Sequence, residues 1–215
     1  MGRQKIDSII VIGGGGHAKV LIGILKKSGA YELVGYTDVR DVGKLLGVPY
    51  LGTDSVLEQM SARIPDCCVA VGVGKVELNK NRLKIVDRVL GLGFRLPAVL
   101  SPHAVVNEDV KIGDGTVVFD GAVINPGARI GRASIINTNS TVEHDCVIGD
   151  NVHIAPGANL SGGVHVGTNC IIGTGASVVQ YVSICDDCLI GAGAAVSRDI
   201  REPGTYVGNP VRKIS

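Results

Sequence analysis

The strongest constraint on this chain is a six-residue repeat that runs without interruption from Ala104 to Asp199. All sixteen hexads have Val, Ile or Leu at the third position, and the first position is always Ala, Val, Thr, Ser or Cys. A period of six is not helical and predicts a short strand followed by a turn, with the third side chain pointing inward. Three hexads then form one triangular coil, and successive coils stack through parallel strands about 4.8 Å apart.

Composition agrees with an aliphatic core and excludes several function classes. The chain is 45% hydrophobic but has only five Tyr, two Phe and no Trp, which argues against disorder and against aromatic platforms for single-stranded nucleic acid. The first hundred residues have 14 Lys and Arg against 9 Asp and Glu. This excess is too small for a nucleic-acid footprint but suits a phosphorylated small molecule.

The sequence also predicts where the protein resides and how its cysteines are used. No run approaches the ~20 apolar residues of a membrane span, so we expect no membrane insertion and a cytoplasmic protein. The six cysteines are too sparse for a disulfide scaffold. Three of them, Cys146, Cys170 and Cys188, occupy first positions of hexads, which favours reduced core thiols over half a zinc site at Cys185 and Cys188.

The N-terminal segment has the pattern of a nucleotide-type βαβ unit. An apolar run at Ser8–Ile12 leads into the glycine turn Gly13–Ala18, then into a helical stretch at Lys19–Ser28. Glycines in such a turn let the backbone approach a phosphate, and the helix N-terminus supplies N–H donors. A second strand, Glu32–Thr37, ends at Asp38, where an acidic residue can accept a ribose hydroxyl.

Two further elements complete the predicted organisation of the chain. We expect a buried strand at Cys67–Val73 and a helix at Glu77–Leu90. The fold class is therefore an α/β, half-Rossmann-like domain followed by a parallel β-helix of hexapeptide repeats. The predicted boundaries are 1–98 for the nucleotide-type domain, 99–200 for the coil and 201–215 for a C-terminal tail.

The combination of the Gly13–His17 loop with the hexads and the ending Gly204–Lys213 resembles a known family over essentially the whole chain. It is similar to the sugar-nucleotide N-acetyltransferases of the bacillosamine and perosamine type, often grouped with the NeuD sialic acid O-acetyltransferases. The resemblance implies a left-handed β-helix, a homotrimer with active sites between subunits, and acetyl-CoA as co-substrate without a metal. The acceptor would be the amine, at C4, of a nucleotide-linked amino-dideoxy sugar for surface glycan or glycoprotein synthesis, with UDP favoured over GDP.

His144 is the strongest candidate for a catalytic base. Acetyl transfer to an amine needs a proton acceptor near neutral pH, and histidine titrates in that range. His144 lies at the fifth position of its hexad, in the polar stretch Asn137–Asp145, where side chains leave the core. The resemblance implies that His144 takes the proton and that Asp145 tunes it, although neighbouring side chains on a strand diverge unless a turn brings them together.

His153 follows nine residues after His144, which is half of an 18-residue coil, so the two rings should lie on different faces of one subunit. The resemblance implies that His153 of an adjoining chain donates to the thioester oxygen. The other residues that the resemblance assigns are small or polar. They are Gly162, Thr174 and Ala192 for acetyl-CoA, in one groove along the coil, and Gly15, Gly16, His17, Thr37, Asp38 and Asn137 for the nucleotide sugar.

Three alternatives stay open from the sequence. The acceptor could be a hydroxyl, as in the sialic acid O-acetyltransferases. A γ-type carbonic anhydrase shares the coil and uses three histidines on zinc, but His144, His153 and His165 do not have its spacing and that family lacks a nucleotide domain. The glycine turn could instead serve a dinucleotide oxidoreductase or a binding module, although about a hundred residues is short for two nucleotide halves.

Overall fold

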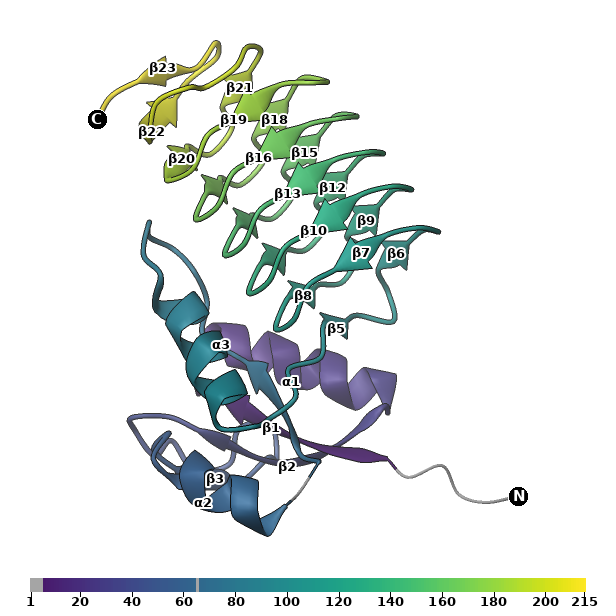
Figure 1. Ribbon diagram of the computed structural model, residues 1–215, viewed down its shortest axis with the longest axis vertical. Helices are drawn as coiled ribbons and strands as arrows, with labels where there is room; N and C mark the ends of the chain where they lie inside the picture. Colours follow the sequence, from purple (N-terminus) through teal and green to yellow (C-terminus); the bar gives the residue numbers. More distant parts are fainter. Residues whose placement is uncertain (1–5, 65) are drawn as a thin grey trace.

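The computed structural model of the chain describes residues 6–64 and 66–215. Its N-terminal part is a parallel four-stranded sheet flanked by helices, and the rest is a stack of coils (Figure 1). The sheet has the order β3-β2-β1-β4 and consists of β1 (Asp7–Ile12), β2 (Tyr31–Thr37), β3 (Tyr50–Gly52) and β4 (Cys68–Val71). The predicted βαβ unit is confirmed, and β3 lies in a segment for which no strand was predicted.

Alternation along β1 explains how the sheet is covered on both faces. Ile9 and Val11 belong to one core cluster with helix α1 (Gly16–Ser28). Ile10 and Ile12 belong to a second cluster with α2 (Val56–Arg63) and α3 (Asn81–Gly91). Helix α2 was not predicted, because its eight residues bury only Leu57 and give a weak apolar pattern.

Helix α3 begins four residues later than the sequence predicts, and Lys75 explains why. The Lys75 side chain is only 2% exposed, and its ammonium donates to the carbonyls of Glu77 and Asn79 at 3.2 and 2.8 Å. These carbonyls therefore turn around a buried cation instead of accepting helical N–H groups. The segment between β4 and α3 becomes a folded loop that packs against the coil.

The hexads form three parallel sheets, one for each side of a triangular β-helix. Sheet 1 contains β5 (Val99–Leu100), β8 (Val117–Val118), β11 (Ile135–Ile136), β14 (His153–Ile154), β17 (Ile171–Ile172) and β20 (Cys188–Ile190). Sheet 2 contains β6 (Val105–Val106), β9 (Val123–Ile124), β12 (Thr141–Val142), β15 (Asn159–Leu160), β18 (Ser177–Val178) and β21 (Ala195–Val196). Sheet 3 contains β7 (Lys111–Ile112), β10 (Arg129–Ile130), β13 (Val147–Ile148), β16 (His165–Val166) and β19 (Ser183–Ile184).

The predicted register is confirmed strand by strand. Ile112, Ile130, Ile148, Val166 and Ile184 pair in sequence along sheet 3, each with the residue 18 positions away. The inward aliphatics and the small first-position side chains, including the three predicted core cysteines, form one continuous buried cluster. The coil thus buries its core by stacking, as a solenoid does.

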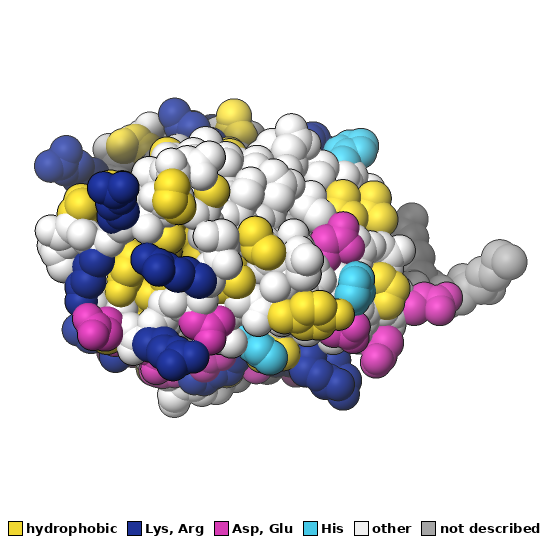
Figure 2. Space-filling model, turned by 90° about the horizontal axis from the view of Figure 1, so that it is seen from above, with side chains coloured by type: hydrophobic (Ala, Val, Ile, Leu, Met, Phe, Trp, Pro, Cys, Tyr) yellow, Lys and Arg dark blue, Asp and Glu magenta, His cyan; other side chains and the backbone are white. Residues whose placement is uncertain are grey.

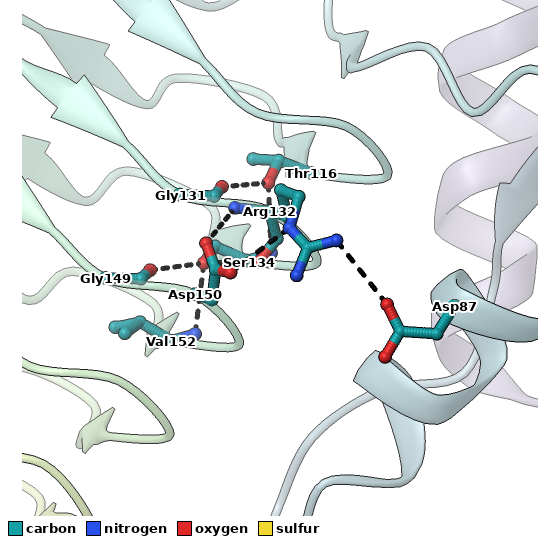
Figure 3. Close-up of polar contacts among 8 residues, drawn as sticks. All are labelled: Asp87, Thr116, Gly131, Arg132, Ser134, Gly149, Asp150 and Val152. Atoms are coloured by element: carbon teal, nitrogen blue, oxygen red, sulfur yellow. Dashed lines mark hydrogen bonds and ion pairs between the residues drawn. The ribbon is translucent and has the colours of Figure 1, made fainter. Parts of the chain in front are cut away.

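Buried first-position hydroxyls add hydrogen bonds between coils (Figure 3). The Thr116 hydroxyl donates to the carbonyl of Gly131 at 2.7 Å and accepts the N–H of Ser134 at 3.0 Å. The Ser134 hydroxyl repeats this pattern one coil later with Gly149 and Val152. Both hydroxyls are fully buried and fully satisfied, so they stabilise the corner instead of weakening the core.

The nucleotide-type domain packs directly on the first coils. Val117, Phe119 and Ile135 of the coil share a buried cluster with α1. Arg132 extends from the same corner toward α3 and lies 3.4 Å from Asp87, as Figure 3 shows. At the far end, β22 (Gly204–Val207) and β23 (Arg212–Lys213) continue sheet 1 and close the stack.

Candidate active site

The glycine turn leaves the N-terminus of α1 open to a ligand. Gly13 has a φ of +105°, which glycine adopts without strain, and its N–H donates to the carbonyl of Thr37 at 2.7 Å. The N-cap of α1 is Gly15, which has no side chain that could cap the first N–H groups of the helix. Gly15 and Gly16 are exposed, and an added Cβ at either would meet nothing within 4 Å. Free N–H groups in such a position favour an anion.

Asp38 and Thr37 hold this turn in different ways. Asp38 accepts the N–H of Gly14 at 2.6 Å and the N–H of Arg40 at 3.0 Å, and its side chain is half-buried. Thr37 is fully buried and its hydroxyl donates to Asp54 at 2.6 Å. In this chain the Thr37 side chain is thus occupied by Asp54, and its assignment as a nucleoside contact stays a prediction. Asp54, which the sequence analysis missed, is the group that Thr37 orients.

His17 faces the coil from the first turn of α1. Its ring packs on Phe119 with centroids 5.1 Å apart. Burial, with smaller contributions from the charges of Arg82 and His153, lowers the pKa of His17 to about 3, so the ring is neutral near pH 7. Its Nε2 atom is buried and has no hydrogen-bond partner among residues 6–64 and 66–215. This atom is available to a polar ligand group that enters between the two domains.

His153 projects from β14 toward the loop that follows β4. Its Nδ1 lies 2.7 Å from the carbonyl oxygen of Lys75, which can only accept, so Nδ1 carries the proton. Its Nε2 lies 3.0 Å from the amide nitrogen of Asn137, whose oxygen accepts the N–H of Thr138 at 2.8 Å. Burial is the largest effect on His153 and lowers its pKa to about 4, so the ring is neutral.

The N–H of the His153 ring is already used within this chain. The only N–H of the neutral His153 ring already donates to Lys75 in the same chain, so it is not free to donate to a thioester oxygen. The remaining donor at this place is the second N–H of the Asn137 amide, which has no acceptor among the described residues. Sequence reasoning did not foresee Lys75, because nothing in its neighbourhood distinguishes it from a surface lysine.

His144 and Asp145 form an exposed pair on the opposite side of sheet 2. His144 Nδ1 lies 2.9 Å from Asp145 Oδ2, and the two side chains are 54% and 73% exposed. Asp145 has a φ of +59°, and this left-handed turn brings the adjacent side chains together where an extended strand would separate them. The contact between His144 and Asp145, which the sequence left open, therefore forms, and it leaves Nε2 of His144 outside the pair.

Gly162 lies one coil above His144, and the His144 imidazole ring packs against its backbone. A Cβ at Gly162 would stand 2.4 Å from His144 Nε2, so only glycine fits under the ring in this orientation. The residues that the sequence analysis assigned to acetyl-CoA lie on two edges of the coil. Gly162 belongs to the turns between sheets 2 and 3, whereas Thr174 and Ala192 belong to the turns between sheets 1 and 2. Within one chain Gly162 therefore lies on a different edge from Thr174 and Ala192, because 12 residues are two thirds of a coil, and the assignment of all three to acetyl-CoA stays a prediction.

Residues 6–64 and 66–215 contain no group of three or more His, Cys, Asp or Glu side chains that could hold a metal ion. Within the same residues, no helix has the length and apolar character needed to cross a bilayer.

Each half of the chain matches a known protein family. Residues 8–89 match the PglD N-terminal domain family, and residues 127–162 and 145–180 match the bacterial transferase hexapeptide family. The acetyltransferase domain of PglB from Neisseria gonorrhoeae is 37% identical, with a TM-score of 0.90 over 96% of this chain and 99% of that chain. No curated protein matches the chain significantly.

Two further solved structures match over nearly their whole length. PerB from Caulobacter crescentus, solved in complex with CoA and GDP-perosamine, is 35% identical with a TM-score of 0.90 over 98% of this chain and 99% of that chain. WeeI from Acinetobacter baumannii is 28% identical with a TM-score of 0.84 over 96% and 99%. The chain therefore belongs to the sugar-nucleotide N-acetyltransferase family, in which a PglD-type N-terminal domain precedes a left-handed β-helix of hexapeptide repeats.

Proposed function

We propose that this protein transfers the acetyl group of acetyl-CoA to the amine of a nucleotide-linked amino-dideoxy sugar, with His144 as the general base. The observation that carries the proposal is the His144–Asp145 pair, held on an exposed edge with Nε2 of the ring above Gly162. Its support from related proteins is the PglB acetyltransferase domain, solved with acetyl-CoA, and PerB, solved with CoA and GDP-perosamine.

The reaction follows from the atoms that this edge presents. The sugar amine attacks the carbonyl carbon of the thioester, a C–N bond forms, and His144 Nε2 takes a proton from the amine. The C–S bond then breaks, and the proton passes from His144 to the departing thiolate. Asp145 holds the ring through Nδ1 and stabilises the imidazolium that forms between the two steps. The free N–H of Asn137 is our candidate donor to the oxygen that gains charge.

The nucleotide sugar would enter on the N-terminal side. Its diphosphate would lie on the open N–H groups of Gly15 and Gly16, and its sugar would approach the unpartnered Nε2 of His17. Asp38 is half-buried beside this turn and is our candidate for the nucleoside contact. We retain UDP as the expected nucleotide and C4 as the expected amine position, and the role in glycan or glycoprotein synthesis and the cytoplasmic location likewise stay predictions.

We further propose that the working form is a homotrimer whose active sites lie between subunits. Sheet 2 separates the edge of His144 and Gly162 from the edge of Asn137, Thr174 and Ala192. Its outward residues are small or uncharged along the whole stack, namely Val105, Val123, Thr141, Asn159, Ser177 and Ala195. Sheet 3 instead presents Lys111, Arg129 and His165. If one copy packs beside the next, the two edges can meet across the interface.

A thiol-release assay tests the reaction. Purified protein is given acetyl-CoA with a panel of UDP- and GDP-linked 4-amino sugars, and the product is analysed for an amide or an ester. We expect CoA release with at least one UDP-linked amino sugar, and a loss of about 10²–10⁴-fold in kcat/KM for His144→Ala. Ester product would support the O-acetyltransferase alternative. Full activity of the His144→Ala variant would remove this residue from the mechanism.

Subunit mixing tests the shared site. The His144→Ala and Asn137→Ala variants are each expected to be weak, since each lacks one half of the site. Co-refolding or co-expression of the two should restore activity well above either alone, because some interfaces then combine an intact His144 with an intact Asn137 from another chain. A monomer by light scattering, or no recovery in the mixture, would contradict the trimeric arrangement.

A further inference from the structure

Tyr181 occupies a backbone conformation that does not suit its side chain. It has a φ of +61° and is 74% exposed, on the same edge of the coil as His144. The corresponding positions of earlier coils have Asp109, Gly127, Asp145 and Gly163, residue types that tolerate this conformation. A bulky aromatic residue here costs folding free energy and gains little burial in the single chain. Such an outlier, exposed at a site edge, points to a function.

The Tyr181 ring lies next to the proposed catalytic pair. Gly163 donates its N–H to the carbonyl of His144 at 2.8 Å, and Tyr181 donates its N–H to the carbonyl of Gly162 at 3.0 Å, so the three turns stack directly. A Cβ on Gly163 would stand 2.5 Å from the Tyr181 ring, just as one on Gly162 would meet the His144 ring. The two rings therefore lie against the same glycine turn, one from the coil before it and one from the coil after it.

The same edge ends in a basic region. Arg198 is 18 residues beyond Gln180 and occupies the next turn above Tyr181. Arg198 also borders a hollow of about 350 Å³ that includes Arg201, Arg212 and Lys213. Asp199 and Glu202 line the same hollow and pair with Arg201 and Lys213, which leaves Arg198 and Arg212 without a carboxylate partner among the described residues. Figure 2, which looks down from this end, shows Lys and Arg side chains gathered there. Three coils separate His144 from Arg198, or about 14 Å at about 4.8 Å per coil.

The geometry points to Tyr181 as a contact for the pantetheine arm of the acyl donor, an inference that rests on the function proposed above. A thioester at His144 places the narrow arm, with its methyl and amide groups, along the next turns of the edge. There the exposed ring gives it a flat apolar surface. The diphosphate and the 3′-phosphate would then reach the arginine side chains at the end of the coil. This order of base, aromatic ring and basic end matches the order of groups in acetyl-CoA.

Two substitutions separate ligand contact from a merely structural role. Tyr181→Asn removes the ring and inserts a residue that tolerates positive φ, and Tyr181→Phe retains the ring. Asp109→Asn is the matched control, since Asp109 has the same conformation (φ +55°) two coils before His144. For each protein we measure CoA affinity by calorimetry, KM for acetyl-CoA and for the amino sugar, kcat, and Tm.

We expect Tyr181→Asn to raise the Kd for CoA and the KM for acetyl-CoA by roughly fivefold, with the sugar KM and kcat within twofold of wild type. Its Tm should rise, because the strained residue is gone. Tyr181→Phe and Asp109→Asn should leave CoA affinity unchanged. A raised Tm with unchanged CoA affinity in Tyr181→Asn would overturn the inference alone. Wild-type protein that binds no CoA would overturn the proposed function itself, and this inference with it.

Discussion

The Nδ1–H of His153 donates to the main-chain carbonyl of Lys75 at 2.7 Å, and this bond joins two residues 78 positions apart in the sequence. The ammonium of Lys75 in turn donates to the side-chain oxygen of Asn169 at 2.7 Å. One loop of the nucleotide-type domain is thus fixed to two successive coils. The position of Asn137, and with it the donor side of the proposed site, depends on this contact between domains.

Burial of His153 makes folding stability depend on pH. Its pKa is lowered from 6.5 to about 4 in the folded protein, so the unfolded chain binds a proton below pH 6.5 that the folded protein does not. Stability should therefore fall as the pH drops from about 6.5 toward 4, and His17 adds a loss of the same sign that extends to about pH 3. Thermal melts of wild type and His153→Gln across this range should show a shallower decline for the variant. Parallel curves would contradict the buried, neutral ring.

Gly162→Ala should separate activity from stability. Gly162 does not have a positive φ, so alanine fits the backbone, but its Cβ would lie 2.4 Å from His144 Nε2 and force the ring away. Because the ring is on a flexible, exposed side chain, Tm should change little, while kcat should fall at least about tenfold. Gly23→Ala in α1 is the control, since its Cβ meets nothing within 4 Å and should leave kcat unchanged. Retained kcat in Gly162→Ala would show that the ring's position does not matter.

The negative charge of Asp145 should stabilise the protonated form of His144 during the reaction. Asn tolerates the φ of +59° at this position, so Asp145→Asn should keep the turn and the Tm. The neutral amide cannot stabilise a protonated His144, and kcat should fall about tenfold while both KM values stay near wild type. Steady-state kinetics on both substrates measure this. An unchanged kcat would reduce Asp145 to a turn-forming residue.

Local sequence pattern accounts for the coil but not for its edges. The hexad rule depends only on neighbouring residues, so it predicts each inward aliphatic, such as Ile148, and its partner Val166. A positive φ recurs at the sixth position of the hexads, Asp145 among them, but the period alone does not show that this turn brings the side chains of His144 and Asp145 into contact. The burial of His153 depends on Lys75, which comes from a loop of the other domain.

The burial of Thr37 and the splitting of the acetyl-CoA residues have the same origin. Thr37 ends a strand whose last side chain turns inward toward Asp54, and a β-strand next to a glycine turn gives no sign of which face its last residue takes. The sequence analysis assigned Gly162 and Thr174 to one groove, yet their separation is not a multiple of 18, so they cannot stack in one chain. Motif matching can identify such residues, but only the three-dimensional structure shows on which edge of the coil each of them lies.

Arg82 is the strongest single link between the two domains, and its loss should be costly. The side chain is 1% exposed, and its guanidinium donates to four carbonyls at 2.7–2.8 Å, those of Val71 and Val73 in the N-terminal domain and of Gly115 and Ala133 in the coil. Arg82→Met fills similar space but leaves these acceptors without a donor, and each buried, unsatisfied group costs about 1–3 kcal/mol. We expect the free energy of unfolding in urea to fall by at least about 3 kcal/mol.

Arg88→Met on the same helix is the control, because Arg88 is half exposed and lies 3.6 Å from Glu58, a surface pair worth less than about 1 kcal/mol. Equal urea midpoints for the two variants would show that the carbonyls find other partners and that Arg82 does not hold the domains together.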